Sequence, residues 1–160
     1  MLELIDDHPI APVQAREYHR LLGYPPGHVL EGRARELAEE TARWYAELGR
    51  PWVYARQVGG LELDSGTVRI RGAEFRAPRL YEQFHAAQAH DVVVTAVSAG
   101  AQCEERAREL WQESKPDEYF FLETFGSAVV EHLITATGAR LCGWAEESGM
   151  WVLPHYSPGY

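Results

Sequence analysis

The chain has 160 residues, of which 46% are hydrophobic and 24% charged, a composition typical of a globular protein with a buried core. Its formal net charge is −9 and its arginines are interspersed with acids, which argues against a nucleic-acid partner. No apolar run approaches the roughly 20 residues of a membrane-spanning helix. The acidic N-terminus also lacks the pattern of a signal peptide, so we expect a cytoplasmic protein without membrane contact.

The first half of the chain predicts helices followed by a small antiparallel meander. A short helix is expected over residues 12–22. Residues 28–48 carry apolar side chains at every third or fourth position, which predicts an amphipathic helix stopped by a glycine and a proline. Residues 52–58, 61–63 and 67–70 then predict strands, because glycine-rich turn signals separate them.

The second half predicts further helices around one strand. Pro78 is placed to begin a helix. Residues 92–97 form a β-branched run that is apolar on both faces, which predicts a central strand. A turn leads to a helix near Ala101, and a long helix follows over residues 116–148, weakened by two glycines and capped by Gly149. The expected fold class is α+β, an antiparallel or mixed twisted sheet with several flanking helices in one domain.

Motifs of known enzyme and metal sites do not occur in the sequence. Cys103 and Cys142 are far apart and form no Cys-x-x-Cys pair, which favours free thiols. His85 and His90 are five positions apart, which is not the spacing that places two ligands on one helical face. There is no glycine-rich phosphate loop and no nucleophile elbow. We therefore expect no metal site.

The last four residues, 157–160, are Ser-Pro-Gly-Tyr. Proline fixes its own φ and glycine accepts positive φ, so this segment predicts a tight turn with a tyrosine just beyond it. Such a turn presents backbone donors and acceptors together with an aromatic wall. The alternative interpretation is an ordinary surface turn.

Three stretches, taken in order, resemble one known family. The first is residues 22–25 (Leu-Gly-Tyr-Pro) before the long amphipathic helix. The second is residues 96–100 (Ala-Val-Ser-Ala-Gly) with two glutamates in the helix that follows. The third is the last helix, with Phe-Gly-Ser-Ala at 125–128, followed by residues 157–160. Over residues 21–160 the chain resembles the activation (reactivation) domain of vitamin B12-dependent methionine synthase, in its shorter single-domain relatives.

In that family an Arg-x-Ala/Ser-Pro-Gly-Tyr segment binds S-adenosylmethionine where the domain docks over a corrinoid held by a neighbouring domain or protein. The resemblance implies backbone contacts from residues 157–159 and a tyrosine that lines the methyl-donor and corrinoid side. Glu131 falls near a family acid and would face the sulfonium or amino group; a solvent-facing helix glutamate is the alternative. The cofactor-binding residues implied are His155, Ser157, Pro158, Gly159, Tyr160 and Glu131, with no catalytic or metal-binding residue.

Two departures from the family pattern bear on this expectation. His155 stands where the family has an arginine, and histidine cannot make the bidentate, permanently charged contact that arginine makes with a carboxylate. The chain also stops at Tyr160, where family members continue, so we expect a domain truncated at its C-terminus and preceded by an N-terminal extension over residues 1–20.

The implied function is accessory to a corrinoid-dependent methyltransferase. The chain would bind S-adenosylmethionine and support the reductive methylation of a partner corrinoid protein, which holds the cobalamin because this sequence lacks an Asp-x-His-x-x-Gly signature. One alternative is a non-catalytic interaction module that kept the fold but lost the ligand. Another is an enzyme with His85 or His155 as general base, for which the sequence offers no nucleophile or acid partner at telling spacing.

Overall fold

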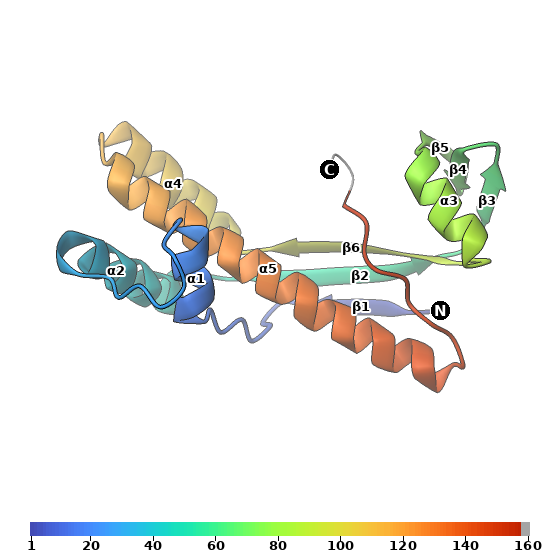
Figure 1. The fold of residues 1–160 in the computed structure, drawn as a ribbon, viewed down its shortest axis with the longest axis horizontal. Helices are drawn as coiled ribbons and strands as arrows, with labels where there is room; N and C mark the ends of the chain where they lie inside the picture. Colours follow the sequence, from blue (N-terminus) through green and yellow to red (C-terminus); the bar gives the residue numbers. More distant parts are fainter. Residues whose placement is uncertain (158–160) are drawn as a thin grey trace. The chain divides into compact units, whose positions relative to one another are not determined.

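The computed structural model describes residues 1–157, and its elements belong to the α+β class, as predicted (Figure 1). Helices and strands alternate irregularly along the chain rather than in repeated βα units. In chain order they are β1 (Glu3–Asp6), α1 (Ala15–Leu21), α2 (Gly32–Leu48), β2 (Trp52–Val58), β3 (Leu61–Asp64), β4 (Thr67–Ile70), β5 (Ala73–Arg76), α3 (Pro78–Ala86), β6 (Val92–Ser98), α4 (Ala101–Gln112) and α5 (Pro116–Glu147).

The chain divides into two compact units. The helical unit comprises residues 6–53 and 97–137, and the sheet unit comprises residues 1–5, 54–96 and the described part of the chain from Gly138 onward. Strands β2 and β6 and helix α5 each contribute residues to both units. None of the helices in residues 1–157 combines the length and the apolar character that a bilayer crossing requires.

Aromatic rings form the centre of the helical unit. The Tyr18 ring meets Phe125 edge-on at 5.0 Å between centroids, and Tyr45 lies 5.2 Å from the same phenylalanine. Both tyrosine hydroxyls donate to backbone carbonyls: Tyr18 to Phe121 at 2.8 Å and Tyr45 to Ala99 at 2.9 Å. Because each buried hydroxyl has an acceptor, the two rings stabilise the core without an unpaired polar group.

The meander of the sheet unit has strand order β3–β4–β5, and α3 packs against β3 and β4 (Figure 1). Asp64 pairs with Thr67, and Ile70 pairs with Ala73, so each hairpin loop has only two residues. Both loop residues have positive φ in Ser65-Gly66 and again in Arg71-Gly72, as type I′ turns require. Sequence reasoning missed β5 because Arg-Gly is not one of the usual turn pairs of such a hairpin.

The other sheet has the order β1–β2–β6, and its strands are antiparallel. The prediction that residues 92–97 form a central strand is wrong, since β6 is at the edge of the sheet formed by residues 1–157 and Val94 is 49% exposed. The central strand is β2, where Val53 and Ala55 are fully buried. A β-branched run favours any strand, and its apolar character did not determine which faces are covered.

Several boundaries also differ from the predictions. Helix α2 begins at Gly32 rather than at residue 28, because residues 28–31 are not helical and Glu31 has the extended backbone of an N-cap, with φ −130° and ψ 162°. Residues 1–20, expected as an extension, include strand β1 and most of helix α1. Gln57 ties β1 to the sheet, since its backbone N–H donates to the Leu2 carbonyl at 2.9 Å and its side-chain oxygen accepts from the Leu2 N–H at 2.9 Å.

Helix α5 runs without interruption for 32 residues, across Gly138 and Gly143, which were expected to weaken it, and across a third internal glycine, Gly126. It ends at the predicted glycine: Gly149 has φ +65°, its N–H donates to the Glu146 carbonyl at 3.0 Å, and the Met150 N–H donates to the Ala145 carbonyl at 2.8 Å. This pair of bonds is a Schellman motif, which satisfies carbonyls that the helix end leaves open.

Candidate functional site

The stretch 96–100 that carries part of the family resemblance forms the passage from strand β6 to helix α4. Gly100 has φ +103°, and a Cβ placed on it would lie 2.5 Å from the Arg50 carbonyl oxygen. Its N–H donates to the Ser98 hydroxyl at 3.0 Å. Only glycine fits this backbone conformation and this close approach, so the glycine at position 100 is required by the turn itself.

Glu131 lies on α5 in the helical unit, within a cluster that the sequence did not indicate. Its carboxylate accepts a hydrogen bond at 3.2 Å from Arg20 of α1, whose guanidinium also binds Glu17 through several contacts. Arg20 lowers the pKa of Glu17 to about 2, mainly by hydrogen bonding. Partial burial and the neighbouring Glu17 raise the pKa of Glu131. The Glu131 side chain remains 51% exposed.

The remaining predicted ligand residues belong to the segment after α5. His155 is exposed and Ser157 is half-buried, and both are in the sheet unit. Pro158, Gly159 and Tyr160, which the resemblance places at the ligand, lie outside the described residues. Within residues 151–157 there is neither helix nor strand, and no backbone hydrogen bond to another described residue is formed. Peptide groups of this segment are therefore free to bind a ligand or water.

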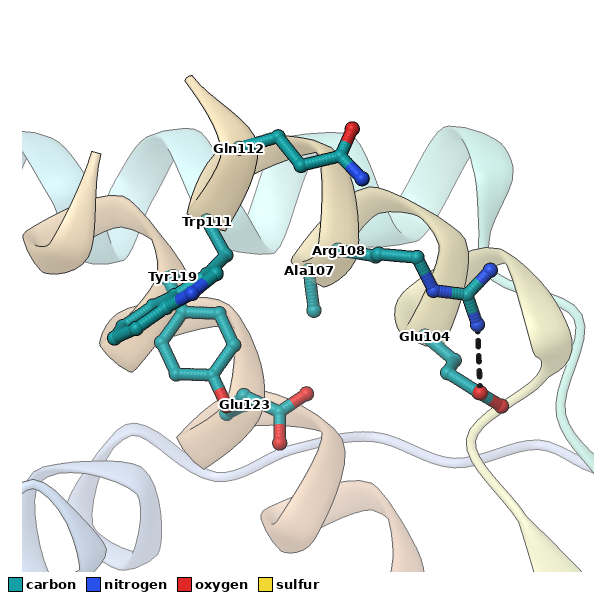
Figure 2. A pocket seen from close by; sticks show the side chains of 7 residues that line it. All are labelled: Glu104, Ala107, Arg108, Trp111, Gln112, Tyr119 and Glu123. Carbon is teal, nitrogen blue, oxygen red and sulfur yellow. Dashed lines mark hydrogen bonds and ion pairs between the residues drawn. The ribbon is translucent and has the colours of Figure 1, made fainter. Parts of the chain in front are cut away.

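A cleft of about 410 Å³ lies between α4 and α5 in the helical unit (Figure 2). Trp111 and Tyr119 form its aromatic end, with ring centroids 5.2 Å apart, and the ion pair of Glu104 with Arg108, 2.9 Å between nitrogen and oxygen, lies at the other. Glu123 projects from α5 beside Tyr119. Sequence reasoning missed this cleft, because its residues come from two helices whose pairing is a tertiary contact.

A second cleft, of about 480 Å³, borders the loop between α1 and α2, where the Leu-Gly-Tyr-Pro stretch lies. The Tyr24 ring stacks on His28 at 4.8 Å with an angle of 6° between their planes. The stack orders a loop that already contains two prolines, and this explains why a defined hollow forms there. Among the described residues that line this cleft, none takes part in an ion pair.

Two thiols and several histidines are possible reactive groups within residues 1–157. Cys103 is buried, its pKa is raised to about 11 by burial and by the charge of Glu123, and a thiol with such a pKa is a poor nucleophile at neutral pH. His85 is exposed and stacks on Tyr81 at 5.7 Å, which agrees with a surface role. Nowhere in residues 1–157 do three histidine, cysteine or acidic side chains gather closely enough to hold a metal ion.

Comparison with known proteins gives no identification: no family model matches the chain, and no curated protein matches it.

Proposed function

We propose that the chain is an S-adenosylmethionine-binding accessory module of the cytoplasm, which supports reactivation of a partner corrinoid protein. The observation that carries the proposal is the segment after α5, residues 151–157, whose peptide groups form no backbone hydrogen bond with other described residues and which leads into the Ser-Pro-Gly-Tyr end. A zwitterionic amino acid joined to adenosine needs several donors and acceptors close together, and unpaired backbone supplies both kinds. Methyl-transfer chemistry would come from the cofactors of the assembly, while the chain positions the donor.

The proposal originates in the family resemblance. The second stretch of that resemblance forms the tight β6-to-α4 turn around Gly100, and residues 125–128 of its third stretch lie within α5. Glu131 keeps an exposed carboxylate that attracts a cation, although Arg20 competes for the same oxygens. Glu131 belongs to the helical unit and the terminal segment to the sheet unit, so we base the proposed site on the backbone of the terminal segment alone.

A thermal-shift titration tests the proposal, because a ligand that binds only the folded state stabilises it by about 2.7 kcal/mol at 100 times its Kd. We expect S-adenosylmethionine to raise the melting temperature of the wild-type chain. His155→Arg restores a bidentate donor for the ligand carboxylate, so we expect it to tighten binding by about 10-fold or more.

His85→Arg is the matched control, since it adds the same charge at another exposed histidine of the sheet unit. This variant should leave the ligand affinity unchanged. The binding function would be refuted if neither the wild type nor His155→Arg responded to the ligand.

An interaction module without ligand is the second candidate. It is favoured by the exposed aromatic side chains in the same segment, Trp151 at 91% and Tyr156 at 41% exposure. Exposed aromatic residues are common anchors of protein interfaces. Under this candidate a corrinoid protein or cobalamin-dependent methyltransferase would bind the chain equally well with and without S-adenosylmethionine, and Trp151→Ala would weaken that complex.

A further inference from the structure

The cleft between α4 and α5 combines an aromatic pair with a carboxylate. Its aromatic end is formed by Trp111, in the last turn of α4, and by Tyr119, in the first turns of α5. The two rings meet at 61°, and Trp111 is 65% exposed although it is packed against its neighbour on one side (Figure 2). The pair therefore presents an open aromatic corner rather than a closed core contact.

The charges of the cleft do not cancel. Arg108 is paired with Glu104 at 2.9 Å, so these two contribute no net charge. Glu123 is four residues after Tyr119 on α5, which places its carboxylate beside the tyrosine ring. In the described part of the chain the Glu123 carboxylate has neither a hydrogen bond nor an ion pair, so one uncompensated negative charge borders the aromatic corner.

We infer that this cleft binds an organic cation, namely an alkylated ammonium group. Aromatic faces attract cations that shed water easily, tryptophan most strongly, and a nearby carboxylate adds direct charge attraction. A strongly hydrated inorganic ion would gain little from the rings. The volume of about 410 Å³ lies within the range of small-ligand sites. None of the lining residues belongs to the proposed S-adenosylmethionine segment. Failure of ligand binding at one of the two sites would therefore leave the proposal for the other unchanged.

Choline and its uncharged analogue 3,3-dimethylbutan-1-ol test the inference, because they share shape and differ in charge. With an isotope-labelled full-length chain, choline should shift the amide resonances of residues 104–123 saturably, and the uncharged analogue should not. We expect Trp111→Ala to weaken choline binding by about 3- to 30-fold and Glu123→Gln to weaken it by several-fold. Trp52→Ala, which removes a tryptophan that is 41% exposed elsewhere in the helical unit, should have no effect.

Two results would overturn the inference: equal shifts with the uncharged analogue, which would mean that only apolar contact matters, or no saturable shift with choline up to solubility. If Trp111→Ala does not fold, Glu123→Gln, an exposed substitution, still tests the charge requirement. A short peptide with trimethyllysine distinguishes the source of the cation. Tighter binding of the peptide than of choline would indicate a protein side chain, and tighter binding of choline a free small molecule.

Discussion

Single residues in this chain are constrained most strongly where backbone approaches backbone. At Gly100 two constraints coincide, a positive φ and the Arg50 carbonyl 2.5 Å from where a Cβ would lie. At Gly138, inside α5, no atom lies within 4 Å of such a Cβ. Gly100 therefore has no room for a side chain, whereas Gly138 does. The sequence alone does not distinguish these two glycines.

Gly100→Ala should lower the free energy of unfolding by about 2–4 kcal/mol, because the new methyl group meets backbone that cannot move aside and the φ is unfavourable for alanine. Gly138→Ala is its matched control and should raise stability by about 0.5–1 kcal/mol through helix propensity. Urea denaturation of the three proteins measures both. Equal midpoints for wild type and Gly100→Ala would contradict this account of the β6-to-α4 turn.

Also at the scale of single residues, the Glu17–Arg20–Glu131 cluster makes the free energy of unfolding depend on pH. The pKa of Glu17 is about 2 in the folded chain, below its ordinary value of 4.5, so its stabilising contribution is present above pH 4.5 and is lost as the pH falls toward 2. Glu131 acts in the opposite sense, since its raised pKa makes its charged form unfavourable as the pH rises. The cluster is exposed, so the effect is screened by salt.

We expect the stability difference between wild type and Glu17→Gln to shrink as the pH is lowered from 4.5 to 2. Glu47→Gln is a suitable control, because among the described residues the Glu47 side chain takes part in no ion pair. Chemical denaturation at a series of pH values provides the comparison. A difference that stays constant through this window would show that Arg20 does not hold the Glu17 carboxylate in solution.

At the scale of elements, the two consecutive helices α4 and α5 both end in a Schellman motif. Helix α4 ends like α5, with Lys115 N–H donating to the Leu110 carbonyl at 2.9 Å, but its left-handed position is occupied by Ser114 at φ +58° rather than by glycine. A side chain in this region costs about 1 kcal/mol relative to glycine.

Ser114→Gly should therefore stabilise the chain by up to about 1 kcal/mol, and Gly149→Ala should destabilise it by a similar amount. Thermal unfolding followed by circular dichroism would register the two changes with opposite signs. A fall in melting temperature for Ser114→Gly would mean that the serine makes a compensating contact.

Element type could be predicted from the sequence more readily than arrangement. The periodicity of residues 28–48 and the turn signals after Val58 predicted α2 and the β3–β4 hairpin, because local pattern determines both. Strand β1 is too short for a pattern to be recognised, and β5 follows an unusual turn. The edge position of β6 depends on which strands pair with which, and no local pattern contains that information.

The candidate sites follow the same division. Cleft residues Trp111 and Tyr119 are ordinary apolar positions in the sequence and meet only because two helices pack. The pairing of Arg20 with Glu131 joins positions 111 residues apart. The terminal segment, by contrast, could be identified from the sequence, because the proline and glycine that favour a turn are adjacent in the chain. Its ligand binding is the property to be measured.

At the scale of the whole molecule, the account predicts a chain that positions a methyl donor for a separate corrinoid protein. Isothermal titration of the intact chain with S-adenosylmethionine, alone and in the presence of a corrinoid protein, tests this claim most directly. The account predicts saturable heats with one site per chain, tightened by the corrinoid partner. Flat heats under both conditions would contradict it.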